Sequence, residues 1–217
     1  MKSLIKSDLV LKDYQVSGIE WLKQNPSRLL ADDMGLGKTI QFIALLLAKG
    51  VGRTLLVLPA SLMTQWRLQL EKFAPSIKIF HYHGENRSLK YLPKTCVVMT
   101  TYTLVANDQK MLSEQFWTRL ILDECHNIRN PKAKSTKACK SLRVGSRWGI
   151  TGTPIQNYLS DLISILEFVG LTKEVIKGDM TKAVEKYTMR RTKAEVNLAD
   201  SVPERKVKKI IILRPII

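Results

Sequence analysis

The 217-residue sequence has only three cysteines and no apolar run long enough to cross a bilayer. The cysteines form no CxxC pair, which excludes a disulfide framework or a zinc cluster built on cysteine and indicates reduced thiols. Apolar runs such as residues 55–58 and 210–213 are far shorter than the roughly 18 residues of a membrane helix. The N-terminus lacks the apolar core of a secretory signal. We therefore expect an intracellular protein with no membrane partner, located in the cytoplasm or nucleoid of a prokaryote or in the nucleus of a eukaryote.

Acidic residues are also scarce. The chain has 19 Asp and Glu against 35 Lys and Arg, a formal net charge of +16. Such an excess favours a polyanionic partner such as nucleic acid or an anionic surface. The densest basic stretch, residues 129–147, has seven Lys or Arg and no acidic residue. Lys134 and Lys137 share one helical face there, which could contact phosphate, although a solvated helix surface has the same composition.

The remaining composition, 45% apolar and 25% charged, is that of a folded globular protein. Short apolar runs alternate with longer segments of helical period, a pattern typical of a parallel sheet with helices on both faces. We expect strands at residues 28–31, 54–58, 78–83, 96–100, 119–122, 148–150 and 209–213, and helices at 39–49, 61–73, 104–113, 131–142, 159–169 and 180–196. The helix at 39–49 is apolar nearly all round, so it should pack deep against the sheet. The sequence thus predicts a single α/β domain.

A glycine-containing loop lies between the first expected strand and the first expected helix. It reads, in order, Asp32, Asp33, Met34, Gly35, Leu36, Gly37, Lys38 and Thr39. Glycines let backbone N–H groups approach phosphate oxygens, Lys38 offers a positive charge to the β and γ phosphates, and Thr39 can hold Mg²⁺ through its hydroxyl. Asp32 stands where the general phosphate-loop pattern has glycine. The alternative is a strand-to-helix turn with an incidental lysine.

Two neighbouring carboxylates, Asp123 and Glu124, follow the apolar strand at 119–122. The carboxyl ends of parallel strands are where ligands bind in open α/β sheets. Asp123 can hold Mg²⁺ there, while Glu124 orients and polarises the water that attacks a γ-phosphate. An acidic turn that caps the next helix is the alternative. His126 is either a polar coupling residue or a structural hydrogen-bonding residue.

These motifs together resemble the Snf2-type ATPases of helicase superfamily 2, whose motor consists of two RecA-like lobes. The resemblance covers nearly the whole chain. It is carried by seven segments in the family's order, residues 11–15, 32–39, 56–59 with Trp66, 100–102, 123–130, 151–157 and 189–193. Asp32 agrees with the family's loop, whereas Asp33 stands where Glu is usual and Cys125 replaces the commoner alanine. The resemblance therefore accounts for the aspartate that the general loop pattern leaves unexplained.

The resemblance implies roles for particular residues. Gln15 would recognise the adenine of ATP. The loop residues Asp33 to Thr39 would bind the nucleotide, with Lys38 on the phosphates and Thr39 on Mg²⁺. Asp123 would hold the metal and Glu124 would act on the attacking water.

Two further groups would connect this site to DNA. The coupling residues would be His126, Thr151, Gly152, Thr153 and Gln156. Contacts to DNA would come from Ser61, Thr100, Thr101, Lys134 and Lys137. Such contacts reach the phosphate backbone and position a protein without reading base sequence. Gln156 and Asn157 separate Snf2 proteins from RNA helicases, which disfavours RNA unwinding.

Residues 1–217 are thus expected to form the first RecA-like lobe of an ATP- and Mg²⁺-dependent double-stranded DNA translocase, with 171–217 a smaller helical segment and strand leading toward the lobe junction. The expected partners are double-stranded DNA, a second RecA-like lobe C-terminal in cis, and a protein bound to the DNA. Because that lobe supplies an arginine worth about 10³ to 10⁵ in rate, the first lobe alone should hydrolyse ATP hardly at all. The alternatives are a strand-separating helicase of the same superfamily and a non-catalytic nucleic-acid-binding regulator.

Overall fold

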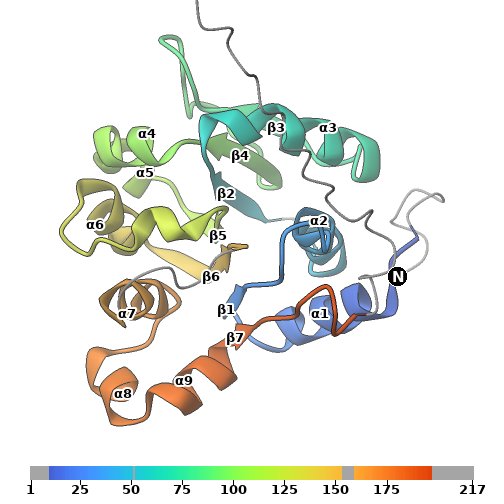
Figure 1. Cartoon of the computed structure of the whole chain (residues 1–217). Coiled ribbons are helices and arrows are strands. Elements are labelled where there is room, and N and C mark those ends of the chain that lie inside the picture. Colours follow the sequence, from blue (N-terminus) through green and yellow to red (C-terminus); the bar gives the residue numbers. More distant parts are fainter. Residues whose placement is uncertain (1–9, 51, 153–158, 197–217) are drawn as a thin grey trace, which may run out of the picture.

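A computed structural model describes residues 10–50, 52–152 and 159–196 of the chain. Its centre is a seven-stranded sheet in the order β3-β4-β2-β5-β6-β1-β7 (Figure 1). Every strand pair in it is parallel. The strands are β1 (Ser27–Leu30), β2 (Arg53–Val57), β3 (Ile79–His81), β4 (Cys96–Thr100), β5 (Trp117–Leu122), β6 (Val144–Ile150) and β7 (Thr188–Met189). Because all strands point the same way, their carboxyl ends share one edge of the domain.

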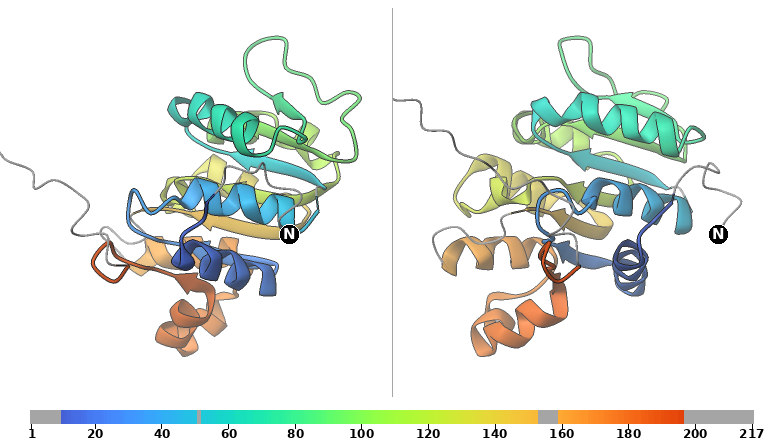
Figure 2. Two further views of the ribbon diagram at one scale, coloured as in Figure 1. Left: turned by 90° about the vertical axis from the view of Figure 1, so that its right-hand side faces the viewer. Right: turned by 45° about the vertical axis from the view of Figure 1, so that its right-hand side comes forward.

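Helices cover both faces of the sheet (Figures 1 and 2). One face carries α1 (Asp13–Gln24), α2 (Lys38–Ala48) and α3 (Met63–Phe73). The other carries α4 (Tyr102–Asn107), α5 (Gln109–Ser113), α6 (Lys134–Ser141) and α7 (Leu159–Phe168), with α8 (Lys173–Gly178) and α9 (Met180–Tyr187) near the β7 edge. This arrangement confirms the predicted α/β class with helices on both sides of a parallel sheet.

The strands divide their side chains between two apolar cores. In β2, Leu55 and Val57 face the core under α4 to α7, whereas Leu56 faces the core under α1 to α3. A strand buried on both faces reads as a continuous apolar run, as expected in a parallel sheet. Residues 41–47 of α2 are all buried, which confirms that this helix packs deep against the sheet.

The boundaries differ from the predictions where tertiary contacts decide them. The helix expected at 180–196 ends at Tyr187, because residues 188–189 pair with β1 as an added edge strand. The helix expected at 104–113 is two helices, which meet at Asp108. Helix α1 was not predicted. Gln15 and Gly18 occupy two of the positions on its buried face, so the helical spacing of apolar residues is weak in this segment. The strand expected at 209–213 lies outside the described residues.

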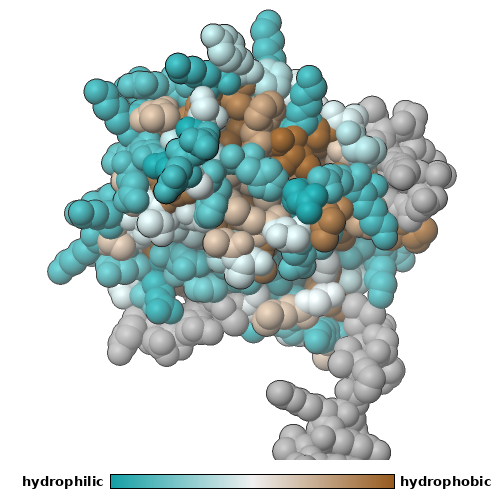
Figure 3. All heavy atoms as spheres, turned by 90° about the horizontal axis from the view of Figure 1, so that it is seen from above, coloured by the Kyte–Doolittle hydropathy of each residue, from teal (hydrophilic) through white to brown (hydrophobic). Residues whose placement is uncertain are grey.

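Strand β3 forms one edge of the sheet and is only three residues long. Figure 3 looks onto the top of the molecule in Figure 1, where β3 and α3 lie, and shows a mainly hydrophilic surface broken by small apolar areas. A short edge strand in polar surroundings offers little for pairing with another sheet. The three cysteines are buried and free. Among the described helices, none has both the length and the apolarity to cross a membrane.

Candidate functional site

The loop after β1 and the turn after β5 meet at one pocket of about 290 Å³. Only β6 separates these two strands in the parallel sheet, so both segments emerge at the same edge. The pocket wall includes Lys38, Thr39, Asp123 and Glu124, with Trp66 of α3 beside them. The structure therefore brings the lysine loop and the carboxylate pair, far apart in sequence, to a single cavity.

The loop before α2 depends on glycine at two positions. Gly35 and Gly37 have φ angles of 90° and 72°, in the left-handed region that residues with a Cβ rarely adopt. A Cβ on Gly37 would also lie 2.4 Å from Nε2 of Gln15, whose amide donates to the carbonyl of Leu36 at 3.2 Å. Gln15 is buried and lies directly against this loop from α1. Gln15, the residue predicted to recognise adenine, is thus hydrogen-bonded to the glycine loop.

The amine of Lys38 turns back onto the loop that precedes it. It donates to the carbonyl oxygens of Asp32 at 2.7 Å and Asp33 at 3.1 Å. Burial lowers the pKa of Lys38, and the nearby carboxylates of Asp32, Glu124 and Asp123 oppose that shift. The pocket thus holds a desolvated cation surrounded by acidic groups.

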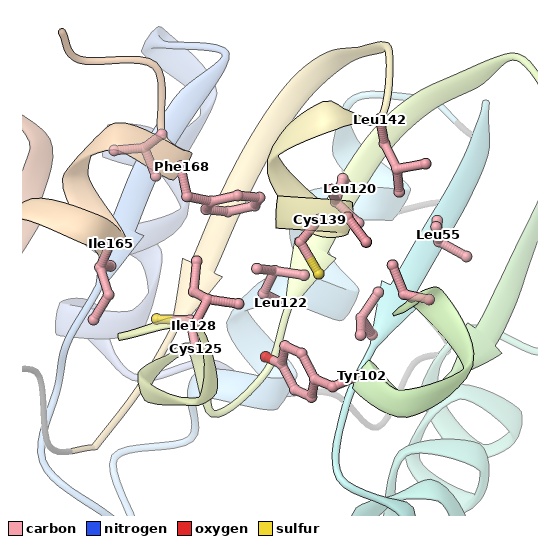
Figure 4. Close-up of a cluster of buried hydrophobic side chains, with 14 of the residues drawn as sticks. Leu55, Tyr102, Leu120, Leu122, Cys125, Ile128, Cys139, Leu142, Ile165 and Phe168 are labelled. Atoms are coloured by element: carbon pink, nitrogen blue, oxygen red, sulfur yellow. The ribbon is translucent and has the colours of Figure 1, made fainter. Parts of the chain in front are cut away.

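Asp123 is fixed from both sides by aromatic residues. The indole Nε1 of Trp66 donates to its carboxylate at 2.6 Å, and the hydroxyl of Tyr102 donates to its carbonyl at 2.6 Å. Figure 4 shows Tyr102 among buried apolar side chains, with its hydroxyl toward the end of β5. Burial raises the pKa of Asp123, and the hydrogen bond from Trp66 opposes that rise. The carboxylate is thus held in one orientation, in a setting that penalises its charge.

Glu124 has a φ of 48°, an unusual angle for a residue with a side chain. Strain of this kind clusters at functional sites, because the surroundings must enforce it. The amide of Asn127 donates to the Glu124 carbonyl at 2.8 Å, and Nδ1 of His126 lies 3.2 Å from the Glu124 carboxylate. His126, a predicted coupling residue, is therefore in direct contact with the predicted water-activating residue.

The other predicted coupling residues begin where β6 ends. Thr151 is buried, and its N–H donates to the carbonyl of Leu30 at 3.1 Å. A Cβ on Gly152 would lie 2.8 Å from Met34 and 3.5 Å from the Lys38 amine, so a larger residue would crowd the loop. Thr153 and Gln156 lie outside the described residues.

The residues predicted to contact DNA do not all reach the surface. Ser61 is exposed, in a 3₁₀ turn at Ala60–Leu62, and Lys134 and Lys137 are exposed on α6. Thr100 is the last residue of β4, which has a strand on either side, and it is fully buried. Contrary to the prediction of a DNA contact, its hydroxyl does not reach the surface.

Thr101 caps α4, because its hydroxyl accepts a hydrogen bond from the N–H of Leu104 at 3.3 Å. It also lines a second cavity of about 510 Å³ at the ends of β2 and β4, together with Arg87 and Asn127. This cavity opens at the same edge of the sheet as the first. Thr101 is itself only 9% exposed, but unlike Thr100 it lines this cavity.

Part of the basic stretch at 129–147 has internal partners. Arg147 donates to the carbonyls of Cys139 at 3.2 Å and Leu142 at 2.6 Å, which closes the end of α6. Lys140 forms an ion pair with Glu167 at 2.7 Å. These two cations support the fold, so only the exposed members of the stretch remain available for phosphate.

Sequence reasoning missed the parts played by Trp66 and Tyr102. Both occur in segments that carry the family resemblance, yet nothing in the sequence indicates that each donates to Asp123, 57 and 21 positions away. Within the described residues there is no group of three or more His, Cys, Asp or Glu placed to hold a metal. Thr39 and Asp123 are the pocket's candidate oxygen ligands, and oxygen is the donor that Mg²⁺ prefers.

The chain is similar to several known proteins. Residues 14–175 match the SNF2-related domain. The helicase swr1 of Schizosaccharomyces pombe is 39% identical over 175 residues, which is 73% of this chain and 14% of that protein. The ATP-dependent DNA helicase DDM1 of Arabidopsis thaliana is 36% identical over 178 residues, 73% of this chain and 23% of that protein. This chain thus spans less than a quarter of the length of either relative.

A solved structure supports the same assignment. The Sulfolobus solfataricus SWI2/SNF2 ATPase core in complex with dsDNA superposes with a TM-score of 0.79 and 32% sequence identity, covering 94% of this chain and 48% of that one. The match extends beyond the sheet to nearly all of the chain. The chain therefore belongs to the SNF2-related domain family, as an ATP-binding lobe of the Snf2 type.

Proposed function

We propose that this chain is the first RecA-like lobe of an ATP- and Mg²⁺-dependent double-stranded DNA translocase that remodels DNA or the proteins bound to it, and that it hydrolyses ATP to ADP and phosphate. The main support is the convergence of Lys38, Thr39, Asp123 and Glu124 on one pocket. Phosphoryl transfer needs a cation for the phosphates, oxygen ligands for a metal and a group that orients water. The pocket offers each of these residue types.

The residues present fit a bound Mg²⁺. The ion prefers oxygen ligands and usually keeps several waters, taking one or two protein groups together with substrate phosphates. The Thr39 hydroxyl and the Asp123 carboxylate are such groups, and Trp66 and Tyr102 hold Asp123 in place. When bound, the ion would neutralise charge on the phosphates. Glu124, held at the strained turn, would orient the attacking water.

DNA is the proposed polyanionic partner. The net charge of +16 and the exposed Lys134 and Lys137 favour a phosphate-bearing ligand. The similar Sulfolobus core is a complex with double-stranded DNA, which suggests the duplex form. Contacts through backbone phosphates suit a motor that moves along any sequence.

The first test is ATP binding by the 217-residue chain, measured by isothermal titration calorimetry with and without MgCl₂. We expect measurable, Mg²⁺-dependent affinity that Lys38→Ala abolishes. Lys110→Ala is the matched control, because it removes an exposed lysine of α5 and should leave binding unchanged. Absence of ATP binding by the wild-type chain would refute the proposal, and would equally favour the non-catalytic regulator.

The second test is turnover. ATP hydrolysis by this lobe alone should be near background with or without duplex DNA, because an arginine from a second lobe is typically worth about 10³ to 10⁵ in rate. Joining the chain to a second RecA-like lobe should give DNA-stimulated hydrolysis. A forked DNA substrate then separates translocation from strand separation, since a translocase leaves the fork paired. Robust turnover by the isolated lobe, lost in Lys38→Ala, would contradict the division of the active site between two lobes.

A further inference from the structure

Two further features of the sequence lie at the phosphate loop, in addition to the residues that line the pocket. One is Asp32, the aspartate that opens the phosphate loop. The other is β7 together with the segment that follows it, which we call the strap (residues 188–193). The structure joins them, because Arg191 of the strap forms an ion pair with Asp32 across 159 positions of sequence.

The Asp32–Arg191 pair is buried. The Asp32 side chain is 0% exposed and that of Arg191 is 15% exposed. Nε of Arg191 donates to one carboxylate oxygen at 2.9 Å and Nη2 donates to the other, which is a two-point contact. A buried carboxylate without a partner is strongly unfavourable, so Asp32 requires Arg191 in this place.

The same guanidinium also contacts the helices on either side of the loop. Nη2 donates to the side-chain oxygen of Gln41 in α2 at 3.0 Å, and Nη1 donates to the backbone carbonyl of Tyr14 in α1. Gln41 in turn donates to Asp32 at 3.2 Å. One side chain from the strap thus connects α1, the phosphate loop and α2, the three elements that carry the predicted nucleotide residues.

The strap backbone extends these contacts along the loop. The N–H of Ala31 donates to the carbonyl oxygen of Met189 at 2.7 Å, and the N–H of Asp33 donates to the carbonyl oxygen of Arg191 at 2.9 Å. The N–H of Lys193 then donates to the Asp33 carboxylate at 3.2 Å. In Figure 1 the segment after β7 runs across α1 and beside the loop between β1 and α2. The pairing of β1 with β7 therefore continues past the strands and onto the phosphate loop.

These contacts fall on the residues that hold Lys38. The Lys38 amine is anchored by the carbonyl oxygens of Asp32 and Asp33. The strap fixes both residues, the first through its carboxylate and the second through its N–H. Displacing the strap would therefore release the carbonyls that position the Lys38 amine.

We propose that Arg191 is a positioning residue for the phosphate loop, and that docking of the strap and binding of the nucleotide are thermodynamically coupled. The inference rests on the proposed function, since it assumes that the ligand of this pocket is ATP. Coupling between two sites is reciprocal. A docked strap strengthens ATP binding, and bound ATP stabilises the docked strap by the same factor.

The test compares Arg191→Ala and Arg191→Lys with Arg190→Ala, the exposed neighbour on the strap. Hydrogen–deuterium exchange of residues 31–37 reports on the loop without any ligand, and calorimetry reports ATP affinity. Arg191→Ala should speed exchange in the loop and weaken ATP binding between about 5-fold and 150-fold, the usual range of coupling between sites. Arg191→Lys should show most of that loss, because an ammonium group lacks the planar fork that reaches several acceptors at once. Arg190→Ala should match the wild type.

The outcomes separate the two proposals. If wild-type protein binds no ATP, the proposed function fails. If wild type binds ATP, and Arg191→Lys binds it equally tightly with the loop amides equally protected, the pair is only structural and the inference fails. Arg191→Lys keeps a positive charge opposite the buried Asp32 and should therefore fold. It tests the inference even if Arg191→Ala does not fold. In wild-type protein, ATP should also slow exchange in residues 188–193, and unchanged exchange there would overturn the coupling.

Discussion

Replacing Trp66 by Phe should reveal how much the hydrogen bond to the Asp123 carboxylate contributes to folding. The two groups are 2.6 Å apart, and their residues are only 1% and 7% exposed. A hydrogen bond to a charged group contributes roughly 1.5–3 kcal/mol. Phe keeps much of the buried ring but has no N–H. We therefore expect Trp66→Phe to lose about 1.5–3 kcal/mol of unfolding free energy near neutral pH in addition to its packing loss.

Trp148→Phe is the matched control. Trp148 is also fully buried, and within the described part of the chain its indole nitrogen has no hydrogen-bond acceptor. Its replacement should therefore cost only packing. Urea unfolding of wild type and both variants at several pH values measures the difference. Equal losses at Trp66 and Trp148 would refute the argument.

The pH dependence distinguishes the hydrogen bond from packing. The folded-state pKa of Asp123 lies above its ordinary value of 3.8, mainly through burial, and Trp66 lowers it. Without Trp66 the folded-state pKa of Asp123 rises further. The folded state then binds more protons than the unfolded state over a wider pH range, so the free energy of unfolding falls by more as the pH rises. The cost of Trp66→Phe should thus be largest at neutral pH and shrink as the pH falls through the pKa of Asp123. A cost that stays constant with pH would mean that only packing was lost.

Three further predictions concern the same site. Because burial lowers the pKa of Lys38 and bound phosphates should raise it, ATP affinity measured by calorimetry should fall as alkaline pH deprotonates the free protein, and an affinity independent of alkaline pH would contradict this. Gly18→Ala would place a Cβ 2.1 Å from the Gln41 side chain and 2.7 Å from that of Arg191, so the melting temperature should fall although alanine favours a helix by about 1 kcal/mol, and a rise would contradict this packing. Tyr102→Phe leaves a buried carbonyl without its donor and should cost about 1–3 kcal/mol in urea unfolding, whereas an unchanged midpoint would contradict the contact.

The sequence determined the fold class and the chemical groups of the site. Alternating apolar runs and helical periods follow directly from burial on two faces of a parallel sheet, and they predicted six of the strands and the deep position of α2. Gly35 and Gly37 predicted the loop, because their φ angles suit few other residues. Lys38 and Asp123 line one pocket because β1 and β5 run in the same direction and end at the same edge of the sheet.

Contacts across long sequence separations were decided only by the tertiary structure. Residues 188–189 lie in a segment of helical pattern, but they form β7 because the edge of β1 offers hydrogen-bond partners. The donation from Trp66 to Asp123, and the pairing of Arg191 with Asp32, join residues 57 and 159 positions apart. Local periodicity carries no information on such pairs, since they form only when the folded sheet brings separate loops to one edge.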